Sequence, residues 1–217
     1  MPQFNARTLA CVAALSLALC SSGWGMVIRV VGDQLILTGP LSGFEVTQFK
    51  SFLTPAVTTV VFYNSGGGDF EAGLNLAAMI RQHGLTTVAQ GFCSSSCANA
   101  FLGGVRRYLA DRRSYVAFHG HYRYAAPMQT RIGEMRNFYG DMTDGKVNDE
   151  LVLLWMRKPR AGMVYFLKHE TYSCNGTEAR RPSGCEKLPQ RALDQSIITA
   201  PDDVEINSTE VKEEVRP

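Results

Sequence analysis

The segment TTVVFYNSGGGDFEAGLNLAAMIRQHG, residues 58–84, decides the fold class of this chain. Its opening residues are β-branched, aliphatic or aromatic, which predicts a buried strand that stops at three glycines. After the glycines, apolar residues recur at helical spacing, and Gly84 stands where a helix commonly ends. These apolar positions are Phe70, Leu74, Leu76, Ala77, Met79 and Ile80. A strand, a glycine turn and a helix in this order are typical of an α/β fold.

The same alternation of strand and helix continues on both sides of this segment. Upstream, two short strands over 26–39 precede a helix over 44–55. Downstream, the sequence predicts a strand over 85–92, a short helix over 96–104, one or two strands ending at His119, and helical structure over 129–160 with a break near Gly145. This order predicts a largely parallel sheet.

Length and composition fit one globular domain flanked by two short segments. The 217 residues are 45% hydrophobic and 19% charged, which is enough apolar material for a single core. We expect the domain to cover residues 26–200. Residues 201–217 are rich in acidic side chains and predict a disordered tail. A formal net charge of +2 without a dense Lys/Arg stripe argues against a nucleic-acid partner.

Residues 1–25 predict a secretory signal peptide or an uncleaved membrane anchor. They carry one arginine and no acid, contain an apolar run, and end in small residues. Cleavage after Ser22 or after Gly25 would satisfy the preference for small residues at such sites. Lipidation of Cys20 is a less favoured alternative. We therefore expect an exported protein, periplasmic or secreted, that contacts a membrane only through this anchor or a lipid at Cys20.

Four cysteines lie beyond the predicted signal peptide, and export favours disulfides between them. They allow three connectivities, of which we favour the local pairs Cys93–Cys97 and Cys174–Cys185. A bridge across four residues requires a distorted turn, because a regular helical turn holds the two Cβ atoms too far apart. A zinc site formed by Cys93, Cys97, His119 and His121 is the less favoured alternative, and we expect no metal and no cofactor.

Three turns that follow predicted strands carry groups that could take part in catalysis. Parallel strands bring such turns to one edge of a sheet. The glycines of 66–68 can offer backbone N–H groups to an oxyanion, although tight turns also need glycine. The serines of 94–96 begin a helix, where serine is also a common N-cap. His119 could activate a serine, or it could be a structural histidine. Together the turns indicate serine acyl chemistry, and the residues alone do not choose among the three serines.

These motifs resemble the ClpP/crotonase fold, and specifically its exported serine protease-like members with a CxSxC nucleophile turn. The resemblance covers residues 27–199 and rests on YNSGGGDFEAGLNLAAMI, GFCSSSCANAFLGG and ADRRSYVAFHGH. It implies a spiral of strand-strand-helix units with a C-terminal helical segment. It also implies Ser95 as the nucleophile, His119 as the base, and an oxyanion hole formed by Gly67 and the N–H of Ser96, with Gly68 adjacent.

The sequence departs from this family at the third catalytic residue. The resemblance places Val164 near the position of the acid, so Glu170, Asp144 or Asp149 would have to replace it, or the site is a Ser–His dyad. A triad without its acid can lose orders of magnitude in rate.

Two function classes therefore stay open. The first is an exported serine hydrolase, with peptidase activity favoured, that acts on a peptide or protein substrate through an acyl-enzyme on Ser95. The second is a non-catalytic binding or assembly module in which CSSSC is a structural disulfide turn. A crotonase-like thioester enzyme is a third and less favoured reading, because an exported protein meets little acyl-CoA. In the first two cases the segment 129–158 would supply a homo-oligomer interface.

Overall fold

A computed structural model describes residues 25–120, 122–123, 126–127, 131–158, 161–175 and 184–200. The predicted signal peptide up to residue 24, the lipidation candidate Cys20, the zinc candidate His121 and the acidic tail 201–217 lie outside these residues. Within the described part, no helix is both long enough and apolar enough to cross a bilayer.

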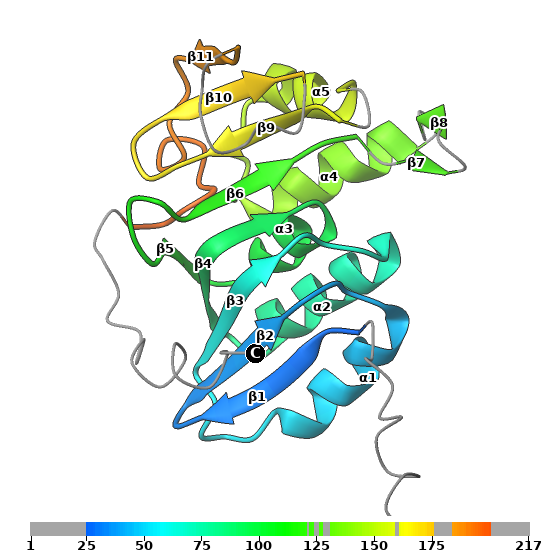
Figure 1. The fold of residues 1–217 in the computed structure, drawn as a ribbon, viewed down its shortest axis with the longest axis vertical. Helices are drawn as coiled ribbons and strands as arrows, with labels where there is room; N and C mark the ends of the chain where they lie inside the picture. Colours follow the sequence, from blue (N-terminus) through cyan, green and yellow to red (C-terminus); the bar gives the residue numbers. More distant parts are fainter. Residues whose placement is uncertain are drawn as a thin grey trace, which may run out of the picture.

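A nine-stranded mixed sheet forms the centre of the molecule (Figure 1). Its strands follow the order β1-β2-β3-β4-β6-β9-β10-β11, and β5 pairs with β4 beside this path. They are β1 (Val27–Val31), β2 (Gln34–Thr38), β3 (Thr59–Ser65), β4 (Thr86–Ser94), β5 (Arg106–Leu109), β6 (Tyr115–Phe118), β9 (Met163–Phe166), β10 (Thr171–Cys174) and β11 (Glu186–Leu188). The short strands β7 (Tyr122–Arg123) and β8 (Ala126–Pro127) pair with each other.

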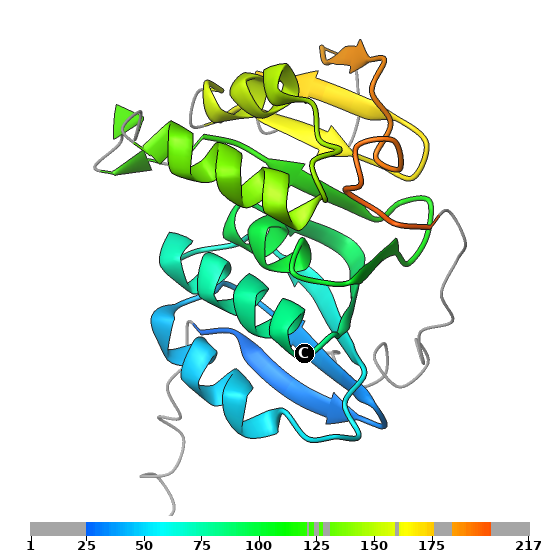
Figure 2. The ribbon, with the colours of Figure 1, turned by 180° about the vertical axis from the view of Figure 1, so that it is seen from behind.

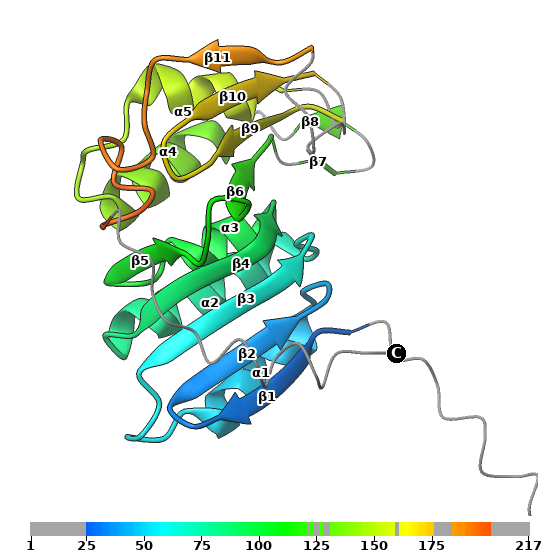
Figure 3. The ribbon, with the colours of Figure 1, turned by 60° about the vertical axis from the view of Figure 1, so that its left-hand side comes forward.

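The middle of the sheet is parallel and its ends are antiparallel. Strands β2, β3, β4, β5 and β6 run in one direction. The hairpin partner β1 closes one end, and β9, β10 and β11 continue the sheet beyond β6 at the other end (Figure 3). The predicted α/β class is therefore confirmed, and the predicted parallel arrangement holds for β2 to β6 but not for the two ends of the sheet.

The five helices of the described residues lie on the same face of the sheet, which Figure 2 shows from the helical side. They are α1 (Gly43–Phe52), α2 (Phe70–Gln82), α3 (Ser96–Phe101), α4 (Ile132–Met142) and α5 (Asp149–Met156). The main core fills the space between the helices and the sheet, and smaller apolar clusters form around Val61 and around Ala117. The helix and strand predicted from residues 58–84 are α2 and β3, joined by the glycine turn.

The predicted helical segment 129–160 is present as α4 and α5, with a turn near Gly145. Its apolar face packs into the protein's own core, because Met135, Tyr139 and Trp155 are all buried. An oligomer interface in this segment would therefore have to use its outer side. The strands β9, β10 and β11 after it were not predicted, since each has only three or four residues and none is followed by a helix.

Candidate active site

The three predicted turns lie side by side at the carboxyl edge of the parallel strands. Ser65 at the end of β3 pairs with Cys93 in β4. Ser94 at the end of β4 pairs with Ala117 in β6. The glycine turn, the serine turn and His119 thus follow three adjacent strands that point the same way (Figure 1). The sequence-based expectation that these groups share one edge agrees with this topology.

Ser95 has a backbone conformation that separates it from its two neighbours. It stands between the end of β4 and the start of α3 with φ of 60° and ψ of −128°, a region that few residues other than glycine adopt. Its N–H donates to the carbonyl of Ala117 at 2.9 Å, which ties the kink to β6. Ser94 is 6% exposed and Ser96 is 1% exposed, whereas Ser95 is only half-buried. Of the three serines, Ser95 is the one that a ligand can reach most easily.

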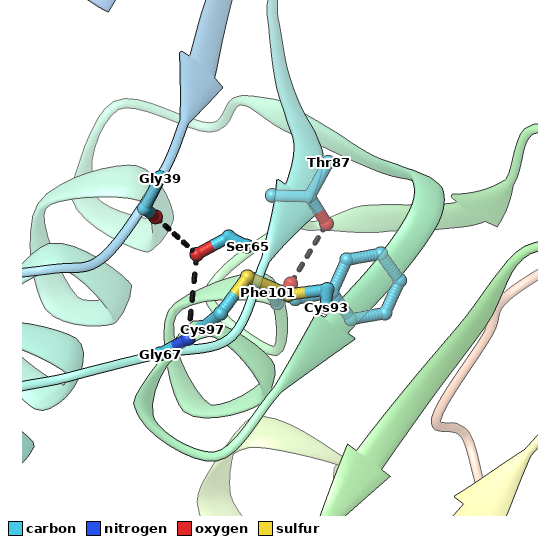
Figure 4. Close-up of a disulfide and its surroundings, with 7 residues drawn as sticks. All are labelled: Gly39, Ser65, Gly67, Thr87, Cys93, Cys97 and Phe101. Carbon is cyan, nitrogen blue, oxygen red and sulfur yellow. Dashed lines mark hydrogen bonds between the residues drawn. A yellow bond between two sulfur atoms is a disulfide. The ribbon is translucent and has the colours of Figure 1, made fainter. Parts of the chain in front are cut away.

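A disulfide holds the two sides of this kink together. The sulfur atoms of Cys93 in β4 and Cys97 in α3 are bonded, and both residues are fully buried. The bridged segment is a strand, a kink and the first turn of a helix, so it is the distorted turn that a bridge at this spacing requires. Figure 4 shows the bridge next to Ser65 and Gly67. The second disulfide joins Cys174 and Cys185, so both are the pairs that the sequence favours.

Gly67 packs directly against the serine turn. Its φ is 86°, and a Cβ added to it would lie 2.5 Å from the carbonyl oxygen of Ser94 and 2.8 Å from both the Cβ of Ser95 and the nitrogen of Ser96. No residue with a side chain fits this position without moving the turn. The glycine at 67 is therefore required by close approach to the Ser95 kink as well as by its backbone conformation.

Gly68 forms a bridge with Leu41, which follows β2. The N–H of Leu41 donates to the carbonyl of Gly67, and the carbonyl of Leu41 accepts from the N–H of Asp69, each at 2.9 Å. These bonds hold the glycine turn beside the segment that follows β2. The assignment of Gly67 and the N–H of Ser96 to an oxyanion hole, with Gly68 adjacent, stays a prediction.

Ser65 is a site residue that the sequence analysis did not identify. It is fully buried, its hydroxyl donates to the carbonyl of Gly39 at 2.7 Å, and it accepts the N–H of Gly67 at 3.4 Å (Figure 4). These bonds fix the start of the glycine turn against the end of β2. A buried serine between the apolar run of β3 and the glycine turn was the available signal.

His119 directly follows β6 and is half-buried. Its Nδ1 lies 2.5 Å from the carbonyl oxygen of Gly120, and because that oxygen can only accept, Nδ1 carries the proton. Burial lowers the pKa of His119 below its ordinary value, and the bond to Gly120 opposes this shift. The ring is therefore neutral near pH 7, with Nε2 as its acceptor nitrogen. A neutral imidazole whose Nε2 is an acceptor is the form that a general base needs.

The place that the resemblance assigns to an acid holds a buried valine. Val164 in β9 pairs with Phe118 and is fully buried. Glu170 accepts from Tyr172 and Lys187 after β9, and since β9 is antiparallel to β6, this turn lies at the sheet edge opposite His119.

Each of the other two carboxylates interacts with an arginine. Asp149 accepts two bonds from Arg136, at 2.5 and 2.6 Å. Asp144 interacts electrostatically with Arg107 in β5. Strand β5 pairs with the first half of β4, at the sheet edge opposite His119. The zinc alternative is not supported in the described part of the chain, where two of its ligands form a disulfide and no group of three or more metal-binding side chains occurs.

No protein-family model and no curated protein sequence matches this chain. Among solved structures, it is similar to ClpP1 from Listeria monocytogenes, with a TM-score of 0.49 and 13% identity over 77% of this chain and 89% of that chain. A mutant of the same protein gives 0.44 and 14% over the same shares. A membrane-bound stomatin-specific protease gives 0.46 and 12% over 82% of this chain and 81% of that chain. Similarity at this level identifies no functional residue of this chain.

Proposed function

We propose that the protein is a serine hydrolase of the peptidase type, with Ser95 as nucleophile and His119 as general base. The observation that carries the proposal is the backbone of Ser95, a strained kink between a strand and a helix with a half-exposed side chain. Strained backbone of this kind persists only where surrounding structure holds it, and it concentrates at active sites. A serine on a sharp strand-to-helix turn is also the arrangement that presents a nucleophile in other hydrolases.

The chemistry would proceed in two steps through an acyl-enzyme. The Ser95 oxygen attacks the acyl carbonyl of the substrate while Nε2 of His119 takes the hydroxyl proton and passes it to the leaving amine. Water then attacks the acyl carbonyl while His119 takes its proton and returns it to the Ser95 oxygen as the ester bond breaks, which releases the acid product. The N–H groups of the glycine turn, Gly67 with Gly68 adjacent, and of Ser96 would stabilise the oxyanion in both steps.

Export and self-assembly belong to the same proposal. Export rests on the sequence of residues 1–25, and the two disulfides are of a kind that persists in oxidising compartments. Self-assembly and a peptide or protein substrate rest on the family resemblance of the motifs. The proposal also includes contact with a membrane, either through an uncleaved N-terminal anchor or through a lipid at Cys20.

A binding or assembly module is the second candidate, and Val164 is the observation that favours it. A buried valine opposite Phe118 leaves that position without a carboxylate to orient His119. In this alternative the same edge of the sheet would hold a peptide without cleaving it.

A fluorophosphonate probe separates the two candidates, because it reacts covalently with an activated serine. We expect the oxidised, folded protein to be labelled, Ser95→Ala and His119→Ala to lose labelling, and Ser94→Ala to keep it, since Ser94 is a buried neighbour outside the mechanism. The lowered pKa of His119 keeps its base form populated at neutral pH, so the labelling rate should be flat near pH 7 and fall only in more acidic buffer. A folded wild type that is not labelled would establish the binding module instead.

A further inference from the structure

A buried carboxylate stands at the point where the described chain begins. Glu45, in the first turn of α1, is 3% exposed. Its Oε2 accepts the N–H of Ser42 at 2.7 Å, which is the glutamate half of the capping box of α1, and it also accepts the hydroxyl of Ser42. Its Oε1 accepts the backbone N–H of Met26 at 3.0 Å. The helix cap thus explains one oxygen of Glu45, and the other is directed at the nitrogen of Met26.

The nitrogen of Met26 is fixed in this position by its surroundings. The Met26 side chain is 4% exposed and belongs to the main core, and β1 starts at the next residue. A Cβ added to Gly25 would lie 2.7 Å from Oε1 of Glu45, so the Gly25–Met26 peptide bond lies directly against the carboxylate. Burial alone raises the pKa of Glu45, but its hydrogen bonds outweigh burial and hold the pKa below the usual value. The carboxylate is therefore charged, and its donors named here are neutral.

The bond that lies against Glu45 is one of the two cleavage sites expected from the sequence. Gly23 and Gly25 provide the small residues that a signal peptidase prefers, and the cut would fall between Gly25 and Met26. Hydrolysis of this bond consumes one water, leaves a carboxylate on Gly25, and gives Met26 a free α-amino group. An α-amino group is protonated at neutral pH, with an ordinary pKa of about 7.7–8.0.

We propose that the mature protein begins at Met26 and that Glu45 is the binding site for its α-ammonium group. Cleavage replaces a neutral amide donor with a cation at the same position, 3.0 Å from a buried carboxylate. Charge-assisted hydrogen bonds are stronger than neutral ones, and a buried carboxylate gains most from a cationic partner. The ion pair would fix β1 and α1 to each other at the start of the fold. This inference does not depend on the serine chemistry.

The test compares two mature chains that differ only in their first residues. One begins at Met26 and the other at Gly23, the product of the alternative cut after Ser22. Each is prepared with Glu45 and with Glu45→Gln, which preserves the capping box. We expect the Met26 form to melt several degrees higher than the Gly23 form, since about 1 kcal/mol shifts the melting temperature by about 2–4 °C in a chain of this size. The difference should disappear in Glu45→Gln.

The intact mass of the exported protein gives an independent readout that needs no variant. Expression of the full chain in a host that exports it should yield a protein whose mass corresponds to residues 26–217. An exported protein that begins elsewhere, or equal melting temperatures of the two wild-type forms, would overturn the proposal. Neither result bears on labelling of Ser95, so this inference and the proposed hydrolase activity fail separately.

Discussion

At the scale of single residues, the candidate site depends on a strained serine and on a glycine packed against it. A non-glycine residue in the conformation of Ser95 costs about 1–3 kcal/mol, so its surroundings must hold it there. The hydrogen bond from the Ser95 N–H to the carbonyl of Ala117 holds one side of the kink, and Gly67 packs against the other. The chemistry proposed for Ser95 therefore requires the absence of a side chain at position 67.

Gly67→Ala and Gly66→Ala form a matched pair that tests this requirement. A Cβ at position 67 would come within 2.8 Å of three atoms of the serine turn, whereas a Cβ at position 66 would meet no atom within 4 Å. We expect Gly67→Ala to abolish fluorophosphonate labelling and to lower the free energy of unfolding by about 1–3 kcal/mol. Gly66→Ala should keep the labelling and stay within about 0.5 kcal/mol of the wild type. Equal labelling of the two variants would contradict the packing described.

At the scale of elements, the alternation of strand and helix up to residue 119 could be read from the sequence because β1, β2, β3 and β4 each end in a glycine or serine turn. β3, α2 and β4 are long and strongly patterned, and their predicted ranges agree with the structure. The hairpin β9–β10 could not be read, because its strands have four residues each and owe their pairing to β6. The sequence also could not single out Ser95 without the family resemblance, because only backbone geometry separates it from Ser94 and Ser96.

Removal of each disulfide should mainly affect a different property, labelling of Ser95 for one and thermal stability for the other. The Cys93–Cys97 bridge spans 4 residues, so it limits the unfolded chain little but crosses the Ser95 kink. The Cys174–Cys185 bridge spans 11 residues and starts at the end of β10, which β6 and β9 separate from β4. Replacing Cys93 and Cys97 with alanine should slow labelling of Ser95 by about tenfold or more, equivalent to about 1.4 kcal/mol, with a modest change in melting temperature.

Replacing Cys174 and Cys185 with alanine serves as the control. It should lower the melting temperature more, because the larger loop restricts the unfolded chain more, and it should leave the labelling rate close to that of the wild type. Labelling and thermal unfolding of both double variants provide the comparison. Unchanged labelling without the Cys93–Cys97 bridge would show that the kink holds without it.

At the scale of the whole molecule, a buried arginine attaches the last described segment to the sheet. Arg107 in β5 is 1% exposed, and its guanidinium donates to the carbonyls of Ser196 and Ile197 as well as to those of Leu102 and Gly104. The backbone N–H of Thr199 donates a hydrogen bond to the carbonyl of Arg107 at 2.9 Å. Residues about 90 positions apart in the chain are thereby joined at the edge opposite the serine turn.

Arg107→Met should destabilise the whole fold without changing the chemistry at Ser95. Burial lowers the pKa of Arg107 to about 10, with Arg81 lowering it further and Asp144 opposing, so the guanidinium stays charged at pH 7. Its removal leaves four carbonyls to be satisfied elsewhere, and we expect a loss of about 3 kcal/mol or more in urea unfolding. Arg106→Met, on the adjacent exposed residue of the same strand, should change stability by about 0.5 kcal/mol or less. If the two variants unfolded at the same urea concentration, the segment 196–199 would be held by its apolar contacts, Ile197 and Ile198, and not by Arg107.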